Sequence, residues 1–107
     1  MGAATINKLQ LLQQNLQQIL LQKQQLGDQV TEIDSALHEL KTTDKAYRII
    51  GKIMLSTPTE TLSKDLEERR EVTQVRLRNF DKQEEKIKQN MQDAQQEVMR
   101  DLKPKKN

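Results

Sequence analysis

Residues 46–57 read Ala-Tyr-Arg-Ile-Ile-Gly-Lys-Ile-Met-Leu-Ser-Thr, and they set the topology of this chain. The stretch concentrates the single Tyr and three Ile around Gly51, which is typical of two short strands. Gly51 and Lys52 fit a two-residue turn with glycine in its first central position, so we predict a β-hairpin. A kinked helix is the alternative, and the β-rich composition with Gly51 disfavours it.

The predicted hairpin is apolar on both faces. Alternation along the stretch places Tyr47, Ile49, Ile53 and Leu55 on one face, and Ile50 and Met54 on the other. A lone two-stranded hairpin is only marginally stable in water, and its two unpaired edges invite pairing with other chains. We therefore expect these six residues to form an assembly surface that completes a sheet or barrel shared between chains.

On the N-terminal side, residues 5–41 carry the repeat of a coiled-coil helix. Alternating steps of three and four residues reach ten seam positions, of which nine are apolar. These positions are Leu9, Leu12, Leu16, Ile19, Lys23, Leu26, Val30, Ile33, Leu37 and Leu40. A spacing of about 3.5 residues keeps such a stripe facing a partner helix, which favours a left-handed coiled coil.

On the C-terminal side, residues 58–102 predict a second helix. Thr57 is expected to be its N-cap, with Pro58 at the first helical position and Glu60 completing a capping box. Its ten seam positions, seven of them apolar, are Leu66, Arg70, Thr73, Leu77, Phe80, Glu84, Ile87, Met91, Ala94 and Val98. Residues 103–107 form a basic tail that ends the helix.

The two helices are expected to pair with each other once the hairpin reverses the chain. The predicted fold is mainly α, a long antiparallel two-helix coiled coil joined by a single β-hairpin that assembles into an intersubunit β-barrel. Lys23 interrupts the seam of the first helix and Glu84 that of the second. Antiparallel pairing of the two helices places these residues within about one helical turn of each other. We therefore predict that they meet and fix the register.

The composition excludes several classes of function. The chain has 107 residues, no Cys, and His38 as its only His, so we expect no thiol chemistry, no metal site, no cofactor and no enzymatic activity. A net charge of +2, balanced along the chain, disfavours a nucleic-acid surface. There is no apolar run of membrane-spanning length and no signal-peptide layout, which favours a cytoplasmic protein.

The sequence resembles the β-type subunits of prefoldin, most closely the archaeal form, over nearly the whole chain. Residues 44–51, Asp-Lys-Ala-Tyr-Arg-Ile-Ile-Gly, are similar to the acidic–x–Tyr–basic–x–x–Gly strand of that family. Residues 76–85, Arg-Leu-Arg-Asn-Phe-Asp-Lys-Gln-Glu-Glu, resemble its second-helix motif, and Gln22-Lys23-Gln24 fits its first helix. A single hairpin is the β-type pattern, whereas α-type subunits carry two.

This resemblance implies a single prefoldin-like domain over residues 1–107. It also implies an ATP-independent chaperone, a holdase, built as a hexamer of two α-type and four β-type subunits. The partners would be an α-type subunit, unfolded proteins and a group II chaperonin that receives them. The alternative is a structural coiled-coil scaffold or tether without chaperone activity.

The resemblance implies that unfolded polypeptide binds where the two chain ends of the coiled coil meet. The apolar residues there, which we call the tip residues, are Ile6, Leu9, Leu11, Leu12, Met91, Val98, Met99 and Leu102. Leu9, Leu12, Met91 and Val98 are seam positions, so packing in the core is the competing interpretation for them. Leu11, Met99 and Leu102 lie off the strict seam and are the better candidates.

Overall fold

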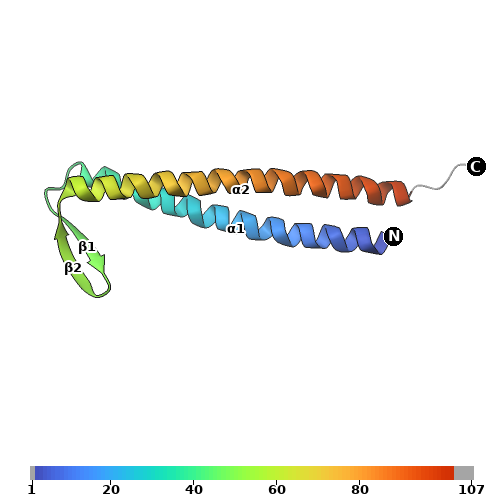
Figure 1. Cartoon of the computed structure of the whole chain (residues 1–107), viewed down its shortest axis with the longest axis horizontal. Helices are drawn as coiled ribbons and strands as arrows, with labels where there is room; N and C mark the ends of the chain where they lie inside the picture. The colour runs from blue at the N-terminus through green and yellow to red at the C-terminus, as the bar shows by residue number, and fades with distance from the viewer. Residues whose placement is uncertain (1, 103–107) are drawn as a thin grey trace, which may run out of the picture. The chain divides into compact units, whose positions relative to one another are not determined.

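The computed structural model describes residues 2–102 of the chain, and the side chains of residues 3–101. The element order is α1 (Gly2–Leu40), β1 (Ala46–Ile50), β2 (Ile53–Thr57) and α2 (Thr59–Leu102) (Figure 1). Two long helices with an antiparallel hairpin between them confirm the predicted arrangement of elements. The predicted basic tail, residues 103–107, lies outside the described residues.

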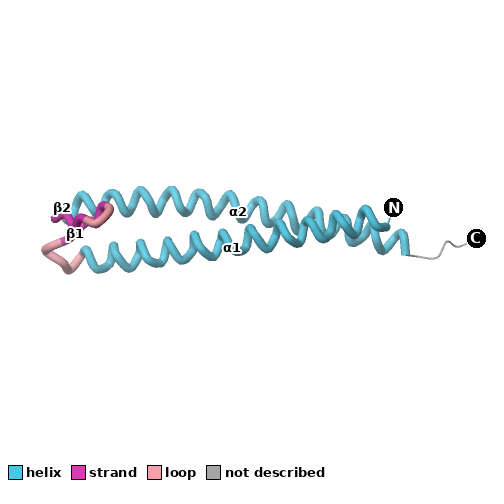
Figure 2. Tube along the Cα trace, turned by 90° about the horizontal axis from the view of Figure 1, so that it is seen from below, coloured by secondary structure: helices cyan, strands magenta, loops and turns pink. Residues whose placement is uncertain are grey.

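The chain divides into two compact units. Among the described residues, unit 1 consists of residues 2–24 of α1 and 78–102 of α2, and unit 2 consists of residues 25–77, which include the hairpin. Within each unit the segments of α1 and α2 run side by side in opposite directions (Figures 1 and 2). Each unit therefore has its own interhelical seam.

The seams hold the apolar core of both units. All twenty predicted seam positions are buried or half-buried. The small side chains are the most deeply buried, with Ala94 2% and Thr73 4% exposed. Thr73 donates its hydroxyl to the backbone oxygen of Arg69 at 2.8 Å, so its burial leaves no unpaired polar atom.

The charged residues that interrupt the seams are paired across the helices. In unit 1, Lys23 Nζ lies 3.2 Å from Glu84 Oε2, which confirms the predicted meeting, and 2.6 Å from Asp81 Oδ1. In unit 2, Arg70 Nε donates to Asp34 Oδ1 at 2.5 Å. A half-buried charge is costly without a partner, so these pairs keep the polar seam positions compatible with packing.

The hairpin has the predicted turn. Ile50 pairs directly with Ile53, which leaves Gly51 and Lys52 as the two turn residues. Gly51 has a φ of +59°, and none of the other described residues has a positive φ. A positive φ at only the first central position is the pattern of a type II′ turn, which matches the twist of the flanking strands.

The predicted assignment of side chains to the hairpin faces is wrong. Residues paired directly across an antiparallel ladder share a face, so Ile53 lies with Ile50, and Met54 lies with Ile49. Leu55 likewise lies with Arg48 rather than with Tyr47. The prediction carried alternation through the turn, but pairing residue 50 with residue 53 reverses the parity of the second strand.

The start of α2 also differs from the prediction. Thr57 is the last residue of β2, pairs with Ala46, and donates its hydroxyl to the backbone oxygen of Leu55 at 3.3 Å. The first helical bond runs from the Leu62 N–H to the Pro58 carbonyl, at 3.1 Å. The strand therefore occupies the residue that was predicted to cap the helix, and α2 begins at Thr59.

Candidate functional site

The hairpin exposes all six of the predicted assembly residues. Their exposed fractions range from 47% at Leu55 to 69% at Ile49. The full set is Tyr47, Ile49, Ile50, Ile53, Met54 and Leu55. Since an apolar cluster of this kind is unfavourable in water, the hairpin is suited to burial against another chain.

Both outer edges of the hairpin are open within the described part of the chain. The sheet contains only β1 and β2, and each strand forms its ladder with the other alone. One row of backbone N–H and C=O groups on each strand therefore faces away from the pair. These rows provide a template for further strands, in addition to the apolar side chains above and below the sheet.

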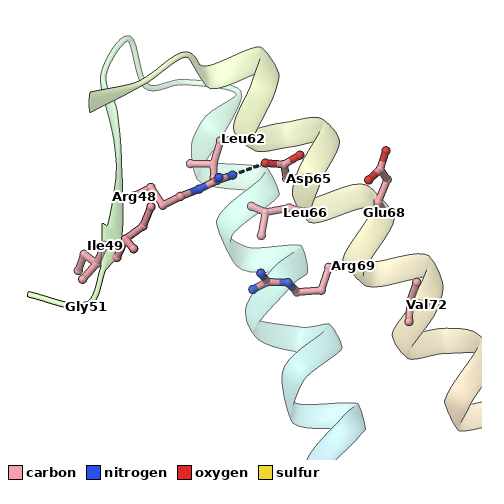
Figure 3. A pocket seen from close by; sticks show the side chains of 10 residues that line it. Arg48, Ile49, Gly51, Leu62, Asp65, Leu66, Glu68, Arg69 and Val72 are labelled. Carbon is pink, nitrogen blue, oxygen red and sulfur yellow. Dashed lines mark hydrogen bonds and ion pairs between the residues drawn. The ribbon is translucent and has the colours of Figure 1, made fainter. Parts of the chain in front are cut away.

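An ion pair attaches the hairpin to α2. Arg48 of β1 reaches Asp65 of α2, and the guanidinium donates to the carboxylate (Figure 3). Ala46, at the start of β1, is buried. Together these residues hold the base of the hairpin, while the apolar side chains nearer the turn stay exposed.

A groove of about 920 Å³ lies between β1 and the first turns of α2. Its apolar lining comes from Ile49 and Ile50 on β1 and from Leu62, Leu66 and Val72 on α2. Arg48 and Asp65 lie in the same groove (Figure 3). The two isoleucines were predicted from the sequence as assembly residues, whereas the contribution of α2 was not, because Leu62 and Val72 lie off the strict seam.

The tip residues divide into two groups in unit 1. The exposed group is Ile6, Leu11 and Met99, with exposed fractions of 48%, 60% and 61%. The half-buried group, at the seam positions, is Leu9, Leu12, Met91 and Val98. Leu102 is the last residue of α2, and its side chain lies outside the described residues. The seam positions therefore have a packing role, which leaves the off-seam side chains free to contact a ligand.

The charge cluster of unit 1 contains a perturbed lysine. Hydrogen bonds from Lys23 to Asp81 and to Glu84 raise its pKa above the ordinary value of 10.5, and burial opposes this effect. The Glu84 side chain is only 15% exposed, and its second oxygen lies 3.9 Å from Lys88 Nζ. The cluster is a structural feature of the seam, and the raised pKa keeps Lys23 charged over the neutral range of pH.

A family model described as a prefoldin subunit matches residues 3–104. The chain belongs to the prefoldin family. Prefoldin is a chaperone and is not classed as an enzyme. Its subunits form complexes with other prefoldin subunits.

Archaeal prefoldin β subunits are among its relatives. The β subunit of Pyrococcus furiosus is 33% identical over 104 residues, which are 94% of this chain and 89% of the relative. That of Sulfurisphaera tokodaii is 32% identical over 94 residues, 85% of this chain and 75% of the relative. The crystal structure of the prefoldin β subunit from Thermococcus strain KS-1 superposes with a TM-score of 0.90 and 27% identity, covering 97% and 94% of the two chains.

The prefoldin motif at residues 44–51 has a structural explanation in this chain. Arg48 holds the ion pair with Asp65, and Gly51 supplies the positive φ of the turn. Tyr47 is paired with Ser56 and is half exposed. The motif therefore combines residues that fix the hairpin with residues that the hairpin presents.

The structure bears on two other classes of site. In the described part of the chain, no group of three or more His, Asp or Glu side chains is placed to hold a metal ion. Neither helix, over residues 2–102, is both long enough and apolar enough to cross a membrane.

Proposed function

We propose that this chain is a β-type subunit of a prefoldin hexamer that binds unfolded polypeptide without ATP and delivers it to a group II chaperonin. Residues 1–107 would act as one prefoldin-type domain in the cytoplasm, with no catalytic role and no cofactor. The observation that carries the proposal is the hairpin, which is exposed, apolar on both faces and open at both edges.

The hairpin supports assembly with an α-type partner. The six apolar side chains of the hairpin are exposed, and each of its strands has one row of backbone groups without a partner in the described part of the chain. A further strand that pairs alongside would bury the side chains and bond the backbone groups. The groove beside β1 offers further apolar contact to that partner. This need for a partner distinguishes a subunit from a tether whose hairpin only reverses the chain.

The tip residues support weak and adaptable binding of unfolded chains. Ile6, Leu11 and Met99 are exposed as separate small apolar groups in unit 1. One such group binds weakly, but several subunits in one assembly raise the effective concentration of the next attachment. Flexible methionine suits a surface that contacts many sequences. Release then follows from the weakness of each contact and requires no nucleotide.

Mixing experiments test the assembly. The purified chain is combined with candidate α-type subunits, and the mass of the complex is measured by light scattering and native mass spectrometry. We expect a hexamer with two α-type and four β-type subunits. A chain that stays monomeric or dimeric with every α-type partner would support the scaffold alternative.

Truncation of the tip tests the binding of clients. Removing residues 1–8 and 99–107 is expected to abolish suppression of client aggregation by the assembled complex, with the hexamer intact by mass. Loss of the hexamer would instead show that these residues are structural. A wild-type hexamer that fails to suppress aggregation would refute the holdase activity itself.

A further inference from the structure

Two exposed leucines of unit 1 belong neither to the hairpin nor to the tip residues. Leu20 is 44% and Leu21 is 56% exposed, and both lie on α1 more than two turns from Leu11. Exposed Leu side chains have an unfavourable contact with water, and no described residue covers these two. The assembly and tip surfaces therefore leave part of the exposed apolar area of α1 without an assigned role.

Charge separates α1 from α2 within unit 1. The sequence has no acidic residue before Asp28. Among the side chains of α1 described in unit 1, Lys8 is the only exposed charged one, because Lys23 is half-buried against Asp81 and Glu84. Over the same unit, α2 exposes ten charged side chains, five of each sign. A ligand that approaches α1 therefore meets an almost neutral surface, whereas α2 presents a strongly hydrated one.

Amides fill the space between the apolar groups of α1. All seven glutamines from Gln10 to Gln24 are exposed. A groove of about 300 Å³ opens between α1 and α2, with the amides of Asn15, Gln18 and Gln22 on α1 and of Gln83 on α2 around a floor of Ile19, Phe80 and Ile87. Each amide both donates and accepts hydrogen bonds, so this surface matches the alternating N–H and C=O groups of a polypeptide backbone. We call the exposed side chains of α1 from Ile6 to Gln24 the neutral surface.

The spacing of the apolar groups argues against a partner helix. Ile6, Leu11, Leu20 and Leu21 are separated by five, nine and one residues. A helix that packs on α1 requires side chains repeated every three or four residues along one face. Ile6 and Leu20 do share a face, but the exposed Gln13 lies between them. An irregular distribution of this kind fits a flexible chain that contacts one apolar group at a time.

We propose that the neutral surface of α1 binds uncharged, apolar segments of non-native polypeptide, so that the client-binding region extends from Ile6 to Leu21 along one helix. This inference rests on the proposed holdase function and specifies which clients it takes. It adds Leu20 and Leu21 to the tip residues, and it gives the charged side chains of α2 in unit 1 the role of a flank that does not bind clients, whereas Met99 remains a tip residue.

Aggregation assays with matched variants test the proposal. The hexamer carrying Leu20→Gln and Leu21→Gln is compared with wild type and with Val75→Gln, which replaces an exposed apolar residue of α2 in unit 2. We expect the double variant to require roughly fivefold more complex for half suppression, because two apolar contacts are lost. The control is expected to match wild type, with mass and helix content unchanged in both.

The outcomes separate the two proposals. A wild-type complex without suppression would refute the holdase function and this inference with it. A wild-type complex that suppresses aggregation, together with a Leu20→Gln/Leu21→Gln complex of equal potency, would refute the inference alone. An equal loss in Val75→Gln would also refute it, since the effect would then be unrelated to the neutral surface.

Crosslinking gives a readout that does not depend on potency. A photo-reactive amino acid replaces Leu21 in one hexamer and the exposed Lys82 of α2 in another, and each is irradiated with a labelled unfolded client. We expect client adducts at position 21 and at least about fivefold fewer at position 82. Equal adducts at both positions, or adducts between two copies of this chain at position 21, would overturn the proposal.

Discussion

At the level of single residues, the charged pairs of the two seams have the same arrangement. In each unit a cation at a seam position reaches an acid of the facing helix, Lys23 to Asp81 and Arg70 to Asp34. Each acid directly follows a buried or half-buried seam residue in the sequence, Phe80 or Ile33. The seam repeat does not predict these two acids, because each lies one residue outside the strict seam. The positions that flank a charged seam residue's neighbours on the facing helix are therefore where its partner is expected.

Replacing both members of the Lys23 and Glu84 pair tests what the pair contributes. We expect Lys23→Leu with Glu84→Leu to raise the thermal unfolding midpoint, because apolar packing replaces two desolvated charges. Lys23→Leu alone is expected to lower it, since Glu84 and Asp81 lose their cation. Circular dichroism of the purified variants measures both changes. A double variant less stable than wild type would show that the pair is a net stabiliser.

The pH dependence of stability follows from the raised pKa of Lys23. A group whose pKa is higher in the folded state stabilises that state fully below its unfolded value of 10.5, and the contribution is lost as pH rises through the folded value. We therefore expect stability to fall above pH 10.5, and to fall less in Lys23→Met. Denaturant unfolding between about pH 9 and 12 measures this. The exposed Lys8→Met is the control, and it should retain the wild-type loss.

Gly27 and Gly51 predict opposite effects of substitution by alanine. A Cβ at Gly27, inside α1, has no atom within 4 Å, so Gly27→Ala should stabilise the chain by about 0.5–1 kcal/mol. Gly51 has a φ of +59°, so Gly51→Ala should destabilise the hairpin by about 1 kcal/mol. Urea unfolding measures both values. A loss of stability in Gly27→Ala would show that this position needs glycine for another reason.

At the level of elements, the sequence predicts the helical seams and the hairpin turn, but not every detail of the hairpin. Every position that the seam spacing predicted is buried or half-buried, because a coiled coil uses one repeat throughout. The predicted seam began at Leu9 and did not include Thr5, which is also buried. The turn was identified because Gly51 supplies a conformation that few residues adopt. The faces of the strands and the start of α2 were not, because they depend on which residues pair across the turn. The groove beside β1 depends on how the hairpin packs on α2, which no local pattern encodes.

Lysine substitutions on each face of the hairpin test the assembly surface. The corrected register groups Ile50 with Ile53 and Ile49 with Met54, so each pair is replaced by lysines in a separate variant. We expect both variants to lose the mass of the assembled complex, because burying two charges in an apolar interface is costly. Helix content should be retained in both.

A variant with Gln89→Lys and Gln92→Lys, on the exposed surface of α2, controls for added charge. It should assemble like wild type. Normal assembly of both hairpin variants would contradict the proposed interface, and a defect in only one would identify the face that partners bury.

At the level of the whole molecule, the exposed apolar groups are divided among separate surfaces with different chemistry. The hairpin exposes a contiguous apolar group suited to lasting burial, whereas α1 in unit 1 exposes isolated residues among amides. The first suits assembly and the second suits transient contact. This division agrees with the membership of the chain in the prefoldin family.

Salt distinguishes client binding by the neutral surface from binding by charged residues. Because α1 in unit 1 exposes only one charged side chain among those described, suppression of aggregation should change less than about twofold between 0.05 and 0.5 M NaCl. The measurement uses assembled complex whose mass is checked at each salt concentration. A loss of about tenfold or more would indicate that the charged side chains of α2 bind the client instead.

The open edges of the hairpin make the amount of this protein relative to its partner important. Backbone N–H and C=O groups are the same in every strand, so a bare edge does not by itself discriminate a proper partner from another copy or from a damaged protein. Discrimination rests on the side chains of one short hairpin. Copies made in excess of a partner are therefore exposed to wrong pairing, and matched synthesis of the two would limit it.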